Sequence, residues 1–177
     1  CAFMEIPFSN PGHIVVRDGG GIESTLIRAH IYDDNGNLIN TPTPVVFTME
    51  PLIGDAYLET PGQTTATVYT VNGVASVSIN SGTDPGPVRI IATCDCDQDG
   101  EIDLTSIDVP VIIASGAPYH IEAEYDPNAT EAIGGGFYQT ECAAIVSDVW
   151  YNPVEDSTFV YWSIDPLPPD TIIDAFV

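Results

Sequence analysis

Residues Gly19–Pro51 read GGGIESTLIRAHIYDDNGNLINTPTPVVFTMEP, and residues Gly134–Pro166 read GGGFYQTECAAIVSDVWYNPVEDSTFVYWSIDP. The two stretches align without a gap at a constant offset of 115 residues, and ten of their 33 positions are identical. Self-similarity at a fixed period indicates repeated structural units, and this period is the size of a small domain. We therefore expect two units of one kind within the 177 residues. The identical positions are the three glycines, Thr25/Thr140, Ala29/Ala144, Asp33/Asp148, Asn37/Asn152, Thr43/Thr158, Val45/Val160 and Pro51/Pro166.

Apolar and polar residues alternate along Ile22–Tyr32, so that Ile27, Ala29 and Ile31 share one face. A period of two is typical of a half-buried strand. Turn signals such as Asn35-Gly36 separate short segments of this kind, and no window has a sustained helical period. This pattern predicts an all-β chain built as antiparallel sandwiches. The other predicted strands are Cys1–Phe8, His13–Arg17, Val45–Met49, Thr64–Val71, Ala75–Asn80, Val88–Thr93, Ile107–Ile113 and Tyr119–Glu124.

The repeat also divides the chain into parts. Residues 9–116 are expected to form one complete domain, and residues 117–177 the first half of a second, because no counterpart of Thr64–Ile113 follows the second copy. Residues 1–8 are expected to be the closing strand of a preceding or neighbouring unit, since Glu5-Ile6-Pro7-Phe8 matches Asp108-Val109-Pro110-Val111. Two arrangements fit these boundaries: a longer tandem array, and a subunit that is completed by another chain.

The charge balance restricts the partners. The chain has 26 acidic residues against three arginines and no lysine, giving a net charge of −23. Binding to a phosphate backbone or to anionic lipid needs clustered cations, so nucleic acid and membrane-surface partners are excluded. The sequence has no run of roughly 18 apolar residues that could insert directly into a membrane. The acidic surface favours solubility and the binding of cations.

One acidic loop has the spacing of a metal site. Carboxylates alternate through Asp95, Asp97 and Asp99, Gly100 permits a sharp turn, and Glu101 and Asp103 offer further oxygens. Hard cations such as calcium prefer oxygen ligands at this spacing. The bidentate acid of a complete calcium loop is missing, because Ser106 stands at its position. We therefore predict calcium here, with a merely solvated acidic hairpin as the alternative.

Four cysteines, Cys1, Cys94, Cys96 and Cys142, are candidates for disulfides. In an acidic all-β chain they indicate an oxidising compartment, and four cysteines allow three connectivities. A lipid anchor on Cys1 is an alternative, but the strand-like sequence that follows Cys1 argues against it. Asn128 begins an Asn-x-Thr glycosylation sequon in an exposed insert.

The repeated pattern resembles bacterial immunoglobulin-like domains of the invasin and intimin type. The resemblance covers nearly the whole chain and implies tandem antiparallel immunoglobulin-like β-sandwiches used as rigid stalks and adhesive arrays on cell surfaces. The family shares no catalytic residues that could be transferred to this chain. The motifs that carry the resemblance are Ala29-x-Ile31-x-Asp33-x-x-Gly36-Asn37, Val45-x-Phe47, Thr70-x-x-Gly73-x-Ala75-x-Val77-x-Ile79 and Gly86-x-Val88-x-Ile90-x-Ala92.

We expect a non-enzymatic, extracellular or cell-surface structural module, a stalk or filament segment that associates with itself or with neighbouring immunoglobulin-like domains. An adhesin that binds a glycan or protein is the second hypothesis, with Trp150 and Tyr151 at a turn as contact residues. The third hypothesis is an accessory domain of a secreted enzyme. No Gly-x-Ser-x-Gly elbow is present, and no nucleophile has an evident histidine partner.

Overall fold

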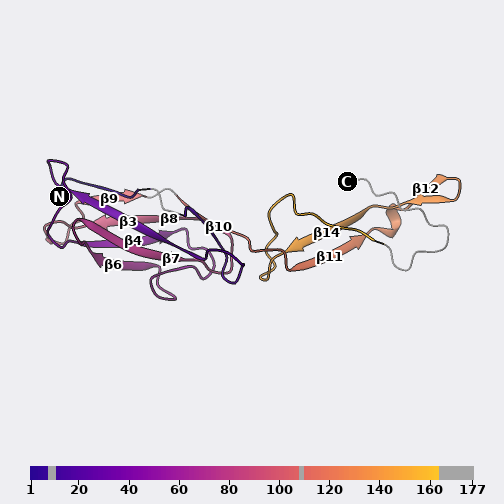
Figure 1. Cartoon of the computed structure of the whole chain (residues 1–177), viewed down its shortest axis with the longest axis horizontal. Coiled ribbons are helices and arrows are strands. Elements are labelled where there is room, and N and C mark those ends of the chain that lie inside the picture. The colour runs from indigo at the N-terminus through magenta and orange to yellow at the C-terminus, as the bar shows by residue number, and fades with distance from the viewer. Residues whose placement is uncertain (8–10, 108–109, 164–177) are drawn as a thin grey trace.

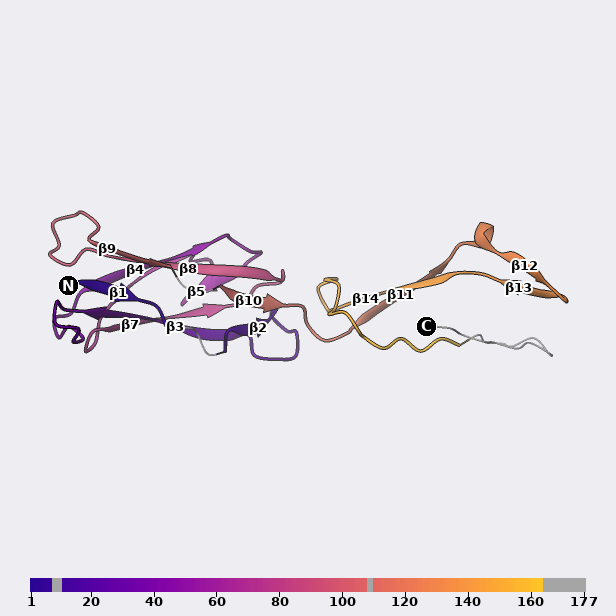
Figure 2. The same ribbon diagram turned by 90° about the horizontal axis from the view of Figure 1, so that it is seen from above.

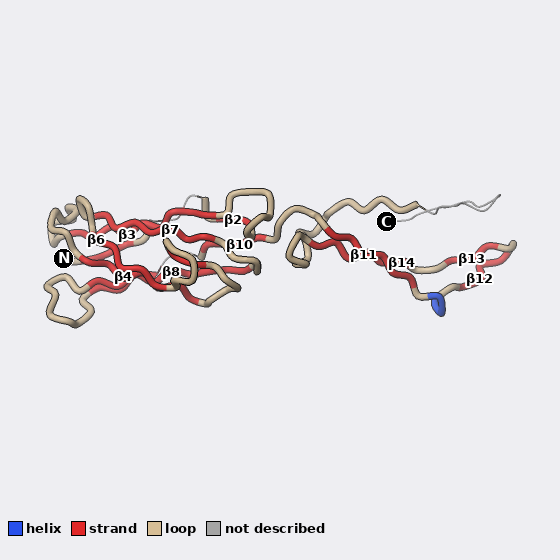
Figure 3. The backbone as a smooth tube through the Cα atoms, turned by 90° about the horizontal axis from the view of Figure 1, so that it is seen from below, coloured by secondary structure: helices blue, strands red, loops and turns tan. Residues whose placement is uncertain are grey.

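A computed structural model describes residues 1–7, 11–107 and 110–163 of the chain. The larger unit is a sandwich of two β-sheets, and a smaller unit extends from one end of it (Figure 1). Figure 2 shows that the two units follow one another along the long axis of the molecule. Within the described residues, a 3₁₀ helix at Pro127–Ala129 (η1) is the one helical element (Figure 3).

The first sheet has the order β1-β3-β7-β5, and every neighbouring pair is antiparallel. Its long central pair places Ala29 opposite Ala75 and Ile27 opposite Val77. Side chains directly opposite in such a pair lie close enough to pack, so this register joins the apolar faces of both strands. The strands are β1 (Phe3–Glu5), β3 (Ser24–Tyr32), β5 (Tyr57–Leu58) and β7 (Val74–Asn80).

The second sheet has the order β2-β10-β8-β4-β6, with β9 also paired to β8. All of its pairs are antiparallel except that of β2 with β10, which is parallel. The strands are β2 (His13–Val15), β4 (Pro44–Glu50), β6 (Thr65–Tyr69), β8 (Gly86–Cys94), β9 (Leu104–Ile107) and β10 (Val111–Ala114).

The core lies between these sheets and follows directly from the alternation in the sequence. Residues of β3 that share one face are fully buried, and their neighbours in sequence face outward. Burying a side chain of this size stabilises the fold by roughly 1.5–3 kcal/mol. The largest fully buried side chains are Phe47, Ile14, Ile27, Ile31, Met49, Leu58, Ile79, Ile90 and Ile113.

The first strand is placed differently from the expectation that residues 1–8 close a neighbouring unit. β1 pairs with β3, in the register Met4 opposite Ile31, and Met4 packs against the core of the same sandwich. A short apolar strand suits any free sheet edge, so its sequence does not specify which edge it joins. Phe8 lies outside the described residues.

The predicted strands of the sandwich are confirmed, with two differences. The segment expected as one strand at Ile107–Ile113 is described as β9 and β10, which pair with different parts of β8. The two-residue strand β5 was not predicted, because it is too short to show a period.

The second unit consists of two antiparallel pairs: β11 (His120–Tyr125) with β14 (Cys142–Ser147), and β12 (Glu131–Gly134) with β13 (Phe137–Gln139). After β14 the chain turns and runs back beside this ribbon (Figure 2). The end of the expected half-domain, residues 164–177, lies outside the described residues.

The repeat is visible in the pairing of the first strands. β14 occupies the position of β3 at the offset of 115 residues, and β11 pairs with it as β1 pairs with β3. Ile121, opposite Val146, thus corresponds to Met4 opposite Ile31. Among the described residues no second sheet faces this ribbon, and Ile121 is accordingly 59% exposed.

Candidate functional site

The two units meet at a turn that both copies of the repeat contain. In the second unit it spans Asp148–Asn152, where Asp148 Oδ1 accepts hydrogen bonds from the backbone N–H groups of Trp150 at 2.8 Å and Asn152 at 2.9 Å. In the first unit, Asp33 Oδ1 accepts equivalent bonds from Asn35 and Asn37, both at 2.9 Å. An aspartate readily closes a turn in this way because its side chain reaches the backbone a few residues ahead.

Within the part of the chain that the structure describes, only the second copy of this turn packs against another unit. The other oxygen of Asp148 accepts the backbone N–H of Gly116 at 2.9 Å, in the linker between the units. The side-chain amide of Asn152 donates to the carbonyl of Thr83 at 2.8 Å, and Ser115 Oγ donates to the carbonyl of Pro153 at 2.6 Å. These bonds join the turn both to the linker and to the end of the sandwich.

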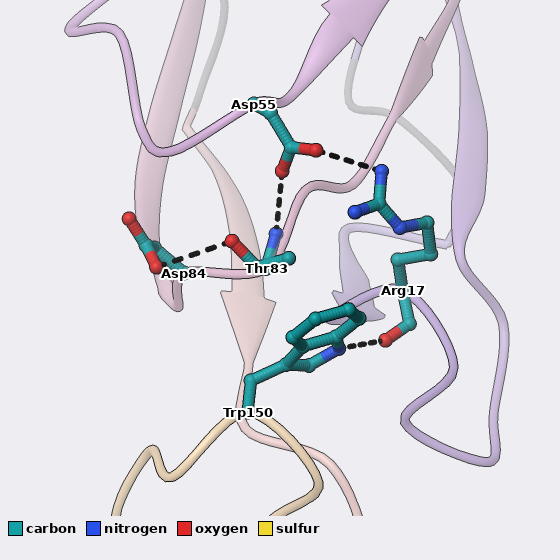
Figure 4. Close-up of polar contacts among 5 residues, drawn as sticks. All are labelled: Arg17, Asp55, Thr83, Asp84 and Trp150. Atoms are coloured by element: carbon teal, nitrogen blue, oxygen red, sulfur yellow. Dashed lines mark hydrogen bonds and ion pairs between the residues drawn. The ribbon is translucent and has the colours of Figure 1, made fainter.

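Arg17 and Trp150 close one side of this junction (Figure 4). The indole N–H of Trp150 donates to the backbone carbonyl of Arg17 at 2.5 Å, and the guanidinium of Arg17 lies 5.4 Å from the centre of the indole ring. Arg17 also forms an ion pair with Asp55 at 2.7 Å, and Asp55 accepts the backbone N–H of Thr83 at 2.8 Å. One arginine thereby connects the sandwich to the turn of the second unit.

Two glycines bring the backbones together at the same place. A Cβ on Gly116 would lie 2.7 Å from the Cα of Gly19, and one on Gly19 would lie 2.6 Å from the carbonyl oxygen of Val16. The backbone N–H of Ala117 donates to the carbonyl of Gly19 at 2.9 Å. The linker therefore lies directly on the loop between β2 and β3, which only residues without side chains permit.

The electrostatics of the junction favour charged aspartates. Burial by itself would raise the pKa of Asp148, but the hydrogen bonds from Gly116, Asn152 and Trp150 outweigh it and hold the pKa below its ordinary value. At Asp55, burial again acts to raise the pKa, whereas the Thr83 N–H and the Arg17 guanidinium lower it overall. Both carboxylates thus act as hydrogen-bond acceptors at neutral pH.

The sequence contained one sign of this junction. Asp148 and Asn152 are identical to Asp33 and Asn37 in the first copy, and this pattern predicts a turn but not a contact between the units. Their partners across the junction are backbone groups of Gly116 and Thr83, which have no signature in sequence.

The acidic loop between β8 and β9 brings its first three carboxylates together. Asp95, Asp97 and Asp99 each offer an oxygen, and these lie within 4.8 Å of one another. The carboxylate of Asp95 also accepts hydrogen bonds within the loop, from the backbone N–H of Gln98 at 2.7 Å and from that of Gly100 at 2.8 Å. Asp103 accepts the N–H of Cys96 at 2.7 Å, and Glu101 is exposed; neither belongs to the cluster of three.

The cysteines divide into one bonded pair and two thiols. Cys1 is joined to Cys96 by a disulfide, whereas Cys94 is buried and free and Cys142 is exposed and free. Burial, together with the carboxylates of Asp103 and Asp95, raises the pKa of Cys94 to about 11. Because the sulfur of Cys1 forms this disulfide, a thioether lipid on that atom would exclude the bond.

The two aromatic contact candidates have different surroundings. Trp150 belongs to the junction, whereas Tyr151 is 67% exposed and stacks on His120, with ring centres 4.1 Å apart.

Asn128, the first residue of the glycosylation sequon, is exposed in η1, where its backbone N–H donates to the side chain of Asp126 at 2.8 Å. This sequon is therefore open to solvent.

Comparison with known proteins supports the fold. No family model matches the sequence, and no curated protein matches it. Among solved structures, the chain is similar to one of FdeC, described as a broadly conserved adhesin of Escherichia coli, with a TM-score of 0.52 and 15% identity. The match covers 88% of this chain and 44% of the FdeC chain, so this chain spans less than half of that structure. The chain has an all-β, immunoglobulin-like sandwich fold.

Proposed function

We propose that this chain is an extracellular structural module, a segment of a stalk or filament that sets distance and stiffness in a surface appendage. The observation that carries the proposal is the junction, where hydrogen bonds reach Ser115, Gly116 and Ala117 from both units. A linker held on both sides resists bending, whereas a free linker of this length would act as a hinge. Neighbouring immunoglobulin-like domains are the proposed partners.

Further observations support a surface location. The likeness to FdeC extends over most of the chain, and that protein is described as an adhesin. A disulfide is present, as is usual in oxidising compartments outside the cytosol. In the described part of the chain, no helix has the length and apolarity needed to span a membrane.

Electron microscopy of negatively stained protein tests this function. We expect straight particles in which the two units lie end to end, and regular filaments if the units continue into an array. Particles bent at widely distributed angles between the units would contradict a stalk.

The adhesin hypothesis is the second candidate, and exposed aromatic side chains favour it. Tyr138 and Tyr151 are 73% and 67% exposed, and aromatic rings are frequent anchors at binding surfaces. A glycan array probed with the whole chain tests this function, with Tyr151→Ala and Tyr138→Ala as variants. Trp150 is unsuitable for this purpose, because its replacement would also alter the junction. Signals that persist in both variants would remove these residues as contacts.

We also propose that the acidic loop binds calcium through Asp95, Asp97 and Asp99. The convergence of three carboxylate oxygens and the net charge of −23 support this site. Neutralising the mutual repulsion of these carboxylates would stiffen the connection between β8 and β9. Calcium should therefore raise the midpoint of thermal unfolding, and EGTA should reverse the rise. An Asp97→Asn variant should respond less; an unchanged midpoint in the wild type would end the calcium proposal.

A further inference from the structure

Three sulfur atoms meet at the end of the sandwich where the chain begins. Cys1 and Cys96 form a disulfide with a Cα–Cα distance of 6.0 Å, which lies within the usual range for such bonds. Cys94 Sγ lies 3.7 Å from Cys96 Sγ, and all three sulfurs lie within 4.8 Å of one another. The free thiol is thus in van der Waals contact with one sulfur of the disulfide.

The three cysteines differ in their access to solvent. Cys94 is the last residue of β8 and is 2% exposed, whereas Cys96 lies two residues further on and is half-buried. Cys1 precedes β1 and is exposed. In Figure 1 the N-terminus lies beside β9, which explains how a residue 95 positions away reaches this loop. Cys96 is therefore placed between a buried thiol and an exposed sulfur.

We propose that Cys1, Cys94 and Cys96 form a disulfide-exchange set, which makes Cys1 a site for covalent attachment through its sulfur. Cys94 first loses its proton, which is an unfavourable step at neutral pH because burial and the nearby carboxylates raise its pKa to about 11. Its thiolate then attacks Cys96 Sγ, the bond from Cys96 to Cys1 breaks, and a Cys94–Cys96 disulfide forms. Cys1 leaves as a thiolate and takes up the proton that Cys94 released. One disulfide is replaced by another, so the step requires no oxidant and no reductant.

The sandwich retains its structure when Cys1 is released. β1 remains paired with β3, Tyr32 still donates its hydroxyl to Glu5 at 2.6 Å, and Phe3 stacks on Tyr32 with ring centres 4.5 Å apart. The released thiol then lies on an exposed residue immediately before an ordered strand. As a thiolate it can attack a disulfide outside this domain, forming a new disulfide through Cys1 and releasing one thiol of that partner, while the domain keeps an internal disulfide.

The original bond remains the favoured one. The Cys1–Cys96 bond closes a loop of 95 residues, whereas a Cys94–Cys96 bond closes a loop of two. A longer loop restricts the unfolded chain more and so stabilises the fold more. The exchanged form should therefore be a minor species until a reagent consumes the Cys1 thiol.

The test uses the whole chain with Cys142→Ser, which removes the other exposed thiol. The folded protein is incubated with N-ethylmaleimide without reductant, and the disulfides are mapped by mass spectrometry after cleavage before aspartate. Because Asp95 and Asp97 flank Cys96, this cleavage separates Cys94 from Cys96 unless a disulfide joins them. We expect maleimide on Cys1 together with a Cys94–Cys96 disulfide, at a rate independent of protein concentration.

Two variants make this test decisive. Cys94→Ser and Cys94→Ala should retain the Cys1–Cys96 disulfide and lower the labelling of Cys1 at least tenfold, because they lack the attacking thiol. Circular dichroism of each variant shows which of them is folded, and a folded one is compared with the parent. Labelling confined to Cys94 in the parent, or labelling of Cys1 that is equal with and without Cys94, would overturn the proposal.

Discussion

Replacing Asp148 by asparagine tests how the junction is held. Asp148 is fully buried and accepts four hydrogen bonds, two from its own turn through Oδ1 and two through Oδ2. The amide oxygen of asparagine can take the place of only one of these oxygens. If it keeps the bonds of the turn, its NH₂ group faces the Gly116 N–H and the Asn152 amide, which are both donors.

The expected loss of stability at the linker follows from this pairing of donors with donors. A buried N–H group left without an acceptor costs about 1–3 kcal/mol. We take about 2 kcal/mol for the local opening of the linker, which corresponds to a factor of about 30 in its equilibrium constant. Hydrogen exchange of the Gly116 amide, followed by NMR, measures this opening directly. Exchange should be about 30-fold faster in Asp148→Asn than in the wild type.

The repeat supplies a matched control. In Asp33→Asn the amide oxygen can keep both turn bonds, and Oδ2 of Asp33 is 3.5 Å from its nearest donor, Asn37 Nδ2. This variant should change stability by less than about 0.5 kcal/mol and leave the Gly116 exchange rate unaltered. Equal rates for the wild type and Asp148→Asn would refute the assigned role of Asp148, and so would equal acceleration by both variants.

Three further predictions concern the same junction. Gly116→Ala should destabilise the junction by about 1–3 kcal/mol, because the new Cβ would lie 2.7 Å from the Cα of Gly19. An unchanged hydrogen-exchange rate of the linker amides around this position would contradict the contact. Trp150→Phe keeps an aromatic ring over Arg17 but loses the hydrogen bond of the indole N–H, so it should destabilise the junction by about 1 kcal/mol in the same hydrogen-exchange assay. An exchange rate equal to that of the wild type would show that this bond does not stabilise the junction. Acid should loosen the junction: the folded-state pKa values of Asp148 and Asp55 lie below their ordinary 3.8, so their stabilisation is complete above that pH and is lost as the pH falls through the folded values. Small-angle scattering between pH 6 and pH 2 should therefore show greater flexibility below about pH 4, whereas a pH-independent profile would exclude these carboxylates from the junction.

The sandwich could be predicted from sequence because its signal is local. Alternation along β3 identifies Ile27, Ala29 and Ile31 as core residues, and all three are fully buried. What the alternation cannot specify is the partner of an edge strand. The first strand was accordingly expected in a neighbouring unit, whereas it pairs with β3.

The repeated glycines show how the same sequence serves two geometries. Gly19–Gly21 lies in the loop that leads from β2 in one sheet to β3 in the other. Gly134–Gly136 instead connects β12 to β13, and all three residues there have φ between 66° and 95°. Glycine tolerates both conformations, so tertiary pairing decides between them and the sequence does not.

The junction and the cysteine pairing depend on contacts between distant residues. Cys1 and Cys96 are 95 positions apart, and the sequence allowed three connectivities among the four cysteines. The hydrogen bonds from Asp148 and Asn152 end on backbone groups of Gly116 and Thr83, which any residue could supply. Such partners become visible only when the fold brings them together.

The central claim is that the linker is held by both units and does not act as a hinge. Residual dipolar couplings measured for the sandwich and for the β11–β14 ribbon in one aligned sample test it most directly. The structure predicts that a single alignment tensor fits the couplings of both units, with the orientation that Figures 1 and 2 show. Two tensors of different magnitude would show that the units move independently, and they would contradict the proposed stalk.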